Sequence, residues 1–188
     1  MKKSTIILSV IGGLLLLLII WIASGYNGML KQEQNVDTAW GNVESQYQRR
    51  KDLIPNLENT VKAYTRHEGE TYLAVTKARS AAMLAQEDAQ GVSQGQAPAD
   101  PAQMQRYIDA QDNARKALDI YVNAVKEAYP DLKSSQNFAD FQAQLEGTEN
   151  RIQIAREAYN TAVKDYNIKV RSFPNVIISG IMLSLIHI

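Results

Sequence analysis

The sequence predicts an all-α protein in which one N-terminal transmembrane helix precedes an antiparallel four-helix bundle of long, up-and-down helices. A charge-free apolar run at residues 6–23 predicts the first helix. After it, apolar residues recur every three or four positions, which is the period of a helix, and no segment alternates as a strand does. We therefore expect a membrane anchor at residues 1–25, a helical-bundle domain at 26–174 and an apolar tail at 175–188.

The N-terminal anchor is the clearest single signal. Residues 6–23 read IILSVIGGLLLLLIIWIA, 18 positions without a charge. As a helix they span about 27 Å, close to the roughly 30 Å of a bilayer's hydrocarbon. Trp21 and Tyr26 lie where interfacial aromatic residues belong. Lys2 and Lys3 also fit the start of a cleaved signal peptide, but such peptides have an apolar segment of only about 7–15 residues. We expect a retained anchor.

The charges on either side of the anchor predict its orientation. Lys2 and Lys3 precede the apolar run, whereas only Lys31 follows it closely. Basic residues favour the cytoplasmic side of a membrane. We therefore expect a single-pass protein of a cell membrane, with a cytoplasmic N-terminus and the bundle outside.

Composition excludes several classes of site. The chain has no cysteine, which excludes disulfides, thiolate metal sites, a cysteine nucleophile and a lipid-modified cysteine. Its 20 basic residues balance 20 acidic ones, so we expect no nucleic-acid partner. Only two histidines are present, His67 and His187, and there is no phosphate-binding or nucleophile motif. We therefore expect no catalytic residue, no metal site, no cofactor and no enzymatic activity.

The first two bundle helices are expected at 36–64 and 68–86. The first has apolar residues in alternating steps of four and three, and Pro55 is expected to kink or split it. A break is expected at 67–69. Residues 87–100 contain two glycines and a proline, so they are expected to form a flexible surface loop.

Two further helices complete the expected bundle. Asp100 is a suitable N-cap for the third helix, which Pro130 ends. Ser134 or Ser135 can cap the fourth, whose apolar seam runs over 138–166. Each helix has one apolar seam, and packing the four seams together at about +20° buries them.

Charged residues on the seams predict an internal polar network. Arg50 and Arg79 occupy core positions of the first two helices. Burying a charge is unfavourable unless it is paired and hydrogen-bonded, so we expect each arginine to pair with a carboxylate, Glu149 or Glu68. The expected network comprises Arg50, Glu68, Arg79, Glu149, Arg156 and Asn160. Two alternatives remain open: these side chains extend outward from the seam edges, or they form a ligand or partner site.

Tyrosine is the other compositional bias, with nine in the chain. Most of them fall on or near the seams. Core packing with the hydroxyl at the rim accounts for this pattern, and an aromatic binding groove is the alternative.

Several motifs resemble the LemA family. They include WGNVE at 40–44, QRRKDLIPNL at 48–57, ENRI at 149–152 and FP at 173–174, in order and with plausible spacing. The RR-x-x-LIPNL string is the specific one. The resemblance implies a bacterial, membrane-anchored four-helix domain with no established catalytic residue to carry over, and some relatives are linked with a membrane zinc protease or with envelope stress.

The tail departs from the family's pattern. Relatives usually continue past the FP pair into a polar tail, whereas residues 176–188 are almost uniformly apolar. As a helix this segment is about 20 Å long, too short to span a bilayer. A truncated reading frame or a foreign junction near Ile181 accounts for it, and a membrane-dipping hairpin partner to the anchor is the alternative.

The function expected from these features is that of a membrane-tethered interaction or scaffold protein of the bacterial envelope. Its partner is expected to be a membrane protease, another envelope protein or a second copy of the chain. A ligand-sensing or signalling input domain coupled to the membrane helix is the alternative. A hydrolase is a third reading, for which no residue can be nominated.

Overall fold

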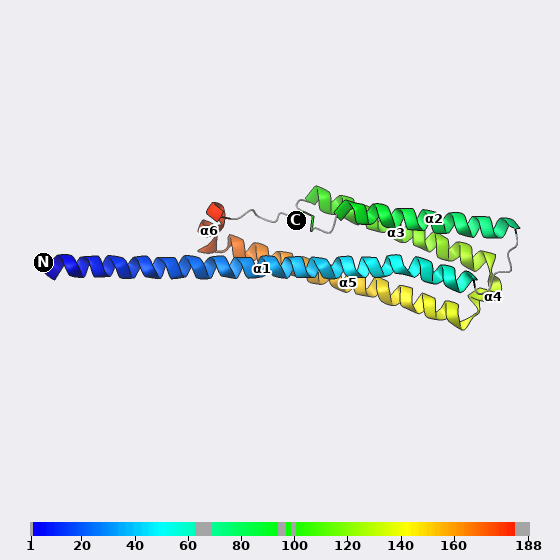
Figure 1. Cartoon of the computed structure of the whole chain (residues 1–188), viewed down its shortest axis with the longest axis horizontal. Helices are drawn as coiled ribbons and strands as arrows, with labels where there is room; N and C mark the ends of the chain where they lie inside the picture. The colour runs from blue at the N-terminus through cyan, green and yellow to red at the C-terminus, as the bar shows by residue number, and fades with distance from the viewer. Residues whose placement is uncertain (1, 63–68, 94–96, 99–100, 183–188) are drawn as a thin grey trace. The chain divides into compact units, whose positions relative to one another are not determined.

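Every regular element in the described part of the chain is a helix (Figure 1). The computed structural model describes residues 2–62, 69–93, 97–98 and 101–182. The helices are α1 (Lys2–Lys62), α2 (Gly69–Ser93), α3 (Pro101–Ala128), α4 (Pro130–Lys133), α5 (Gln136–Arg171) and α6 (Asn175–Met182). The all-α class is therefore confirmed, while the antiparallel four-helix arrangement stays a prediction.

Helix α1 joins the expected anchor and the first expected bundle helix in one 61-residue element. It runs through Pro55, so the expected split does not occur. Proline removes one hydrogen bond of the helix, but Leu53, Ile54 and Leu57 on either side of it are 3%, 1% and 0% exposed. Their packing holds the helix together at this point.

Helix α2 is longer than the sequence predicts, because it continues to Ser93 where a loop was expected from residue 87. The reason lies in its buried face. Gln86 and Ala89 are 1% and 0% exposed, and the Gln90 amide bonds to side chains of α1. Tertiary packing therefore overrides the weak helical signal of this polar stretch.

The connection between α3 and α5 contains a short helix that the sequence pattern did not predict. Pro130 ends α3 as expected, but it also occupies the first turn of α4. Leu132 of α4 is fully buried. Ser135 caps α5, as one of the two predicted serines, because its Oγ accepts a hydrogen bond from the Phe138 N–H at 3.2 Å.

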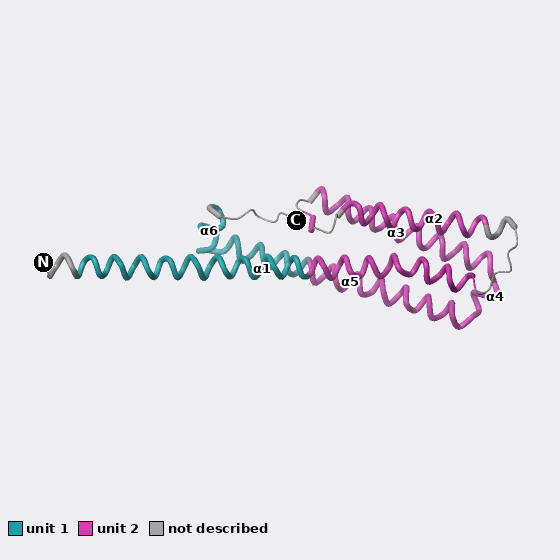
Figure 2. Tube along the Cα trace, viewed as in Figure 1, with its two compact units in different colours: residues 1–38, 160–186 teal, residues 39–159, 187–188 magenta. Residues whose placement is uncertain are grey.

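The described residues form two compact units, coloured separately in Figure 2. One unit is residues 39–159, whose core draws on α1 to α5. Tertiary packing of α2 on α3 is part of it. The core residues are Leu53, Ile54, Leu57, Val61, Val75, Ala82, Leu118, Tyr121, Val122, Val125, Leu132, Phe138 and Phe141.

The other unit joins residues 2–38 of α1 to 160–182 of α5 and α6. Its buried side chains include Met29, Val36, Tyr166, Val170 and Ile178. By contrast, residues 6–20 are all exposed. Among the described residues, α1 alone is long and apolar enough to cross a membrane, with a mean hydropathy of 3.0 over its most apolar window and none of that window buried. The domain boundaries expected after residues 25 and 174 stay predictions.

Candidate functional site

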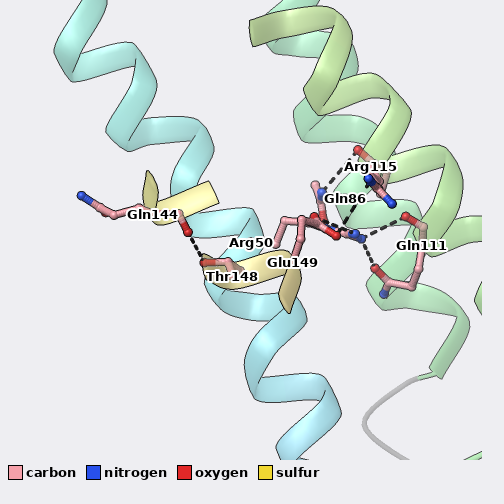
Figure 3. Close-up of polar contacts among 8 residues, drawn as sticks. Arg50, Gln86, Gln111, Arg115, Gln144, Thr148 and Glu149 are labelled. Carbon is pink, nitrogen blue, oxygen red and sulfur yellow. Dashed lines mark hydrogen bonds and ion pairs between the residues drawn. The ribbon is translucent and has the colours of Figure 1, made fainter. Parts of the chain in front are cut away.

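The candidate site is built around Arg50 of α1, which is only 2% exposed in the unit of residues 39–159. Its position on the apolar seam directs the guanidinium inward. Nη2 donates to two oxygens of Gln111 on α3, the side-chain Oε1 at 2.6 Å and the backbone carbonyl at 3.0 Å (Figure 3). A single glutamine thus supplies both short acceptors of the buried charge.

A carboxylate from α5 completes the cluster. Arg50 Nη1 lies 3.5 Å from Glu149 Oε1, and Arg115 Nε lies 3.8 Å from Glu149 Oε2. Both ion pairs are longer than the about 2.7–2.9 Å of a charge-assisted hydrogen bond. Within the described residues, Arg50 Nε and Glu149 Oε1 make no hydrogen bond. The carboxylate therefore compensates the buried charge from a distance, while the amide of Gln111 holds the guanidinium in place.

Two more side chains border this cluster. The Gln86 amide of α2 donates to the Ala114 carbonyl of α3 at 3.4 Å, and Gln86 is 1% exposed. On α5, the buried Thr148 hydroxyl donates to the Gln144 carbonyl at 2.7 Å. Figure 3 shows these polar groups beside Arg50. Polar side chains from four helices thus occupy core positions of this unit.

Arg79 lies in a second, separate pair. Arg79 forms an ion pair with Glu58 of α1. Lys62 Nζ also lies 2.8 Å from Glu58 Oε1, so the carboxylate is shared by two basic side chains. Glu58 was not among the predicted partners. The signal that identifies it is its position four residues before Lys62, on the edge of the α1 seam next to Leu57.

Three further residues belong to the predicted network. Arg156 is half-buried on α5, and its charge acts on the Tyr47 hydroxyl. Asn160 is exposed and belongs to the other unit. Glu68 lies outside the described residues. Gln111 was not among the predicted network residues; an amide at a core position of the third helix is the signal that would have identified it.

An aromatic cluster lies next to Arg50. Trp40 packs against Tyr107 and Tyr159, with ring centroids 4.9 and 5.2 Å apart. Tyr47 meets Tyr107 edge-on at 5.6 Å, and the Arg50 guanidinium carbon lies 4.9 Å from the Tyr47 ring centroid. Such aromatic pairs contribute about 0.5–1.5 kcal/mol each beyond the area they bury. Tyr47, Tyr107 and Tyr159 therefore pack in one aromatic cluster with Trp40.

Burial also fixes the protonation state of two tyrosines in this cluster. Desolvation raises the pKa of Tyr47 above its ordinary value, although Arg156 and Arg50 act in the opposite direction. Desolvation likewise raises the pKa of Tyr107 far above its ordinary value. Both side chains are therefore neutral phenols at physiological pH and cannot act as bases or nucleophiles.

An open groove borders the aromatic cluster. It has a volume of ≈ 380 Å³ and is lined by Gly41, Glu44, Ser45, Tyr47, Gln48, Gln90, Tyr107 and Gln111. The Gln90 side chain forms part of the groove's wall. Its Oε1 accepts a hydrogen bond from Lys51 Nζ at 2.8 Å, and its Nε2 donates one to Gln48 Oε1 at 2.5 Å. The groove's lining offers amides, hydroxyls, aromatic faces and the carboxylate of Glu44, which bind by hydrogen bonding, stacking and charge. No group of three or more His, Cys, Asp or Glu side chains that could hold a metal occurs in the described part of the chain.

Comparison with known proteins agrees with the motifs quoted above. The LemA family model matches residues 39–184, which includes α6 and most of the apolar tail. Protein LemA of Metamycoplasma hominis is 24% identical to this chain over 147 residues, or 78% of this chain and 60% of that protein. The chain thus spans about 60% of the length of the curated relative that it matches. Since the family model covers well over half of the sequence, the chain belongs to the LemA family.

Proposed function

We propose that the chain is a bacterial membrane-anchored interaction protein. The first part of α1 crosses the cell membrane once, the long helical segments form an antiparallel, up-and-down four-helix bundle, and the bundle binds another protein without catalytic activity. One observation carries the proposal: a single helix, α1, presents exposed apolar residues at 6–20 and also supplies core residues such as Ile54 and Leu57.

The exposed run supports a bilayer as the surroundings of this segment. Its large apolar side chains are 48–66% exposed between Ile6 and Ile20. An apolar surface of this extent is unfavourable in water at roughly 25 cal/mol per Å². Its length matches the hydrocarbon thickness of a membrane. A lipid environment removes this cost without any further protein.

Contacts between α1 and α2 support the antiparallel arrangement. Lys51 of α1 meets Gln90 of α2, and Glu58 of α1 meets Arg79 of α2. Residue numbers therefore rise along one helix while they fall along the other. The break between the two helices is short, as antiparallel neighbours require.

The chemistry of the site supports binding rather than catalysis. Arg50 is held by Gln111 and Glu149 inside the core, where no substrate reaches it. Tyr47 and Tyr107 stay neutral, and the groove beside them has no acid–base pair. The family resemblance favours a membrane protease as the partner, with a second copy of the chain as another candidate and no nucleic acid.

Photo-cross-linking in the membranes of the native host tests this proposal. A photoreactive amino acid replaces Leu84 on α2 or Ile154 on α5, exposed apolar side chains at 60% and 57%. We expect one discrete adduct whose mass identifies a single partner protein from at least one of these positions. The matched control carries the same amino acid at the buried Leu118, which is 1% exposed and should give no adduct. The absence of any adduct from both exposed positions would contradict an interaction role.

The groove beside Tyr107 favours ligand sensing as a second candidate function. Its volume of ≈ 380 Å³ is at the lower end of small-molecule sites. Gly41 lines it, and a Cβ added there meets nothing within 4 Å, so a larger residue can be introduced at this point of the groove. If the groove binds a ligand, a small-molecule extract of the host should raise the Tm of the purified protein, and Gly41→Phe should abolish that shift. No shift in the unaltered chain would exclude this candidate.

A further inference from the structure

Helix α6 combines buried polar residues with exposed apolar ones. Asn175 and Ser179 are 8% and 6% exposed and the apolar Ile178 is 5% exposed, whereas Val176 and Ile177 are 46% and 53% exposed. Phe173, in the turn just before α6, is 82% exposed. A short helix at a water-exposed surface normally exposes its polar side chains and buries its apolar ones.

The inward polar side chains have a structural reason to be there. Asn175 Nδ2 donates to the Lys169 carbonyl at 3.0 Å, and Ser179 Oγ lies 3.3 Å from the Val170 carbonyl. Both carbonyls are in the last turn of α5, where no further helical N–H reaches them. Satisfying the end of α5 thus places Asn175 and Ser179 inward together with Ile178, while Val176 and Ile177 stay exposed.

The position of α6 in its unit identifies what surrounds this apolar face. A Cβ added to Gly25 of α1 would lie 2.9 Å from Asn175 Oδ1 and 2.9 Å from Ile178 Cδ1. Helix α6 therefore packs directly on α1 where the apolar run ends. Trp21 and Phe173 line the same cavity of ≈ 470 Å³. The exposed Phe173 thus lies beside Trp21, and α6 follows it at the end of the apolar run of α1.

Basic residues follow at the next level along α1. The Lys169 side chain lies over Gly28, with Cε 3.2 Å from the position of an added Cβ. Lys169 and Arg171 are both exposed at the end of α5. In membrane proteins, apolar side chains face the hydrocarbon, aromatic rings lie at the interface and basic groups reach the headgroups. The residues of this unit follow the same order.

We propose that Phe173, Val176 and Ile177 insert into the interfacial layer of the same bilayer that α1 crosses. Lys169 and Arg171 then face the lipid phosphates. Interfacial helices insert about 5–10 Å into the boundary between headgroups and acyl chains. The inference rests on the proposed function, because it places α6 at the surface of the membrane that holds the anchor.

Fluorescence labelling of the full chain in lipid vesicles tests this contact. The chain has no cysteine, so single-cysteine variants take one environment-sensitive label each. The vesicles contain phosphatidylcholine and phosphatidylglycerol, with or without nitroxide-bearing lipid. We expect the Ile177→Cys label to emit at shorter wavelength, to lose intensity with nitroxide lipid and to resist quenching by aqueous iodide.

Ile154→Cys on α5 is the matched control, since Ile154 is 57% exposed against 53% for Ile177. Its label should remain open to iodide and unaffected by nitroxide lipid. Leu15→Cys reports on the anchor and should be quenched by nitroxide lipid placed deep in the acyl chains. The side chains of Leu15, Ile154 and Ile177 are all exposed, so the three substitutions should preserve the fold. Far-UV circular dichroism checks the helix content of each variant.

The outcomes separate the two proposals. Quenching of both the Leu15 and Ile177 labels by lipid supports both. If the Leu15 label is quenched and the Ile177 label behaves as the Ile154 label does, the α6 contact is wrong and the anchor stands. If the Ile177 label is shielded from iodide but not quenched by lipid, a protein surface covers α6 and the lipid contact is wrong. If the Leu15 label is not quenched, the anchor and the α6 contact are both wrong.

Discussion

The buried charge at Arg50 is held by a neutral amide more closely than by a carboxylate. Gln111 accepts at 2.6 and 3.0 Å, whereas Glu149 lies 3.5 Å away. The sequence predicted the burial of Arg50 because the residue occupies a core position in the apolar seam of α1. It could not predict Gln111 as the partner, because a seam shows which face is buried but not which residue lies opposite across two helices.

Removing the buried guanidinium should therefore be costly. Arg50→Ala leaves the Gln111 oxygens without their donor and removes the buried charge that faces Glu149, and we expect it to lower the free energy of unfolding by about 3–5 kcal/mol. Gln111→Ala should cost about 1–3 kcal/mol. Arg115→Ala is the matched control, because its side chain is 58% exposed and exposed pairs contribute at most about 1 kcal/mol. Urea unfolding measures all three, and equal effects for Arg50→Ala and Arg115→Ala would contradict this view of the site.

Glu58 makes a pH-dependent contribution to stability. Its pKa lies below the ordinary value of 4.5, chiefly through the hydrogen bond from Lys62 and also through Arg79, while burial opposes the shift. A carboxyl with a lowered folded-state pKa stabilises the protein above its unfolded pKa and loses that contribution as the pH falls through the folded value. Glu58→Gln should therefore reduce the loss of stability between about pH 5 and pH 3. Thermal unfolding across this range measures it, and an unchanged slope would show that Glu58 is not paired in solution.

At the scale of elements, the existence of the long helices was predictable, whereas their ends and the short helix α4 were not. The long seams predicted α1, α3 and α5 because burial repeats over many turns. The end of α2 was placed too early, since residues 87–93 are mostly polar and only Ala89 and Gln90 reveal the packed face. Helix α4 was missed because four residues are too few for a period.

The packing of α6 on α1 depends on the absence of a side chain at Gly25. Gly25→Val would place atoms within 2.9 Å of Asn175 Oδ1 and Ile178 Cδ1, so these side chains must shift and the packing of α6 on α1 is weakened. We expect faster hydrogen exchange of the α6 amides in this variant, with the exchange of α3 unchanged. Gly41→Ala is the control, since nothing lies within 4 Å of its added Cβ, and it should stabilise α1 by roughly 0.5–1 kcal/mol. Unchanged exchange of α6 in Gly25→Val would contradict the close packing.

At the scale of the whole molecule, the long apolar helix, the helical class and the family followed from the sequence, whereas the packing of α6 did not. Composition shows that residues 176–182 are mostly apolar but not which side of α6 faces outward. That depends on the carbonyls at the end of α5, which Asn175 and Ser179 satisfy. The partner is not predictable either, because no motif in the chain specifies one.

Orientation in the membrane is a testable consequence of the charge distribution. Lys2 and Lys3 precede the expected anchor, whereas Lys31 and Lys169 lie near its other end. These two lysines do not reverse the expected orientation, because large domains cross membranes largely regardless of their charge. We expect a membrane-impermeant maleimide to label Ile154→Cys in intact cells. Labelling only after lysis would place residues 39–159 in the cytoplasm and reverse the proposed orientation.

We propose that α1 passes from lipid into the protein core as one continuous helix. A cysteine-accessibility scan along α1 in native membranes, from Ile7 to Val36, measures this transition. We expect protection from aqueous maleimide up to about Trp21, rising reactivity across the next two turns, and then a helical alternation in which the buried Met29 and Val36 stay protected. Uniform reactivity from Ile7 onward would contradict a helix that passes from lipid into protein.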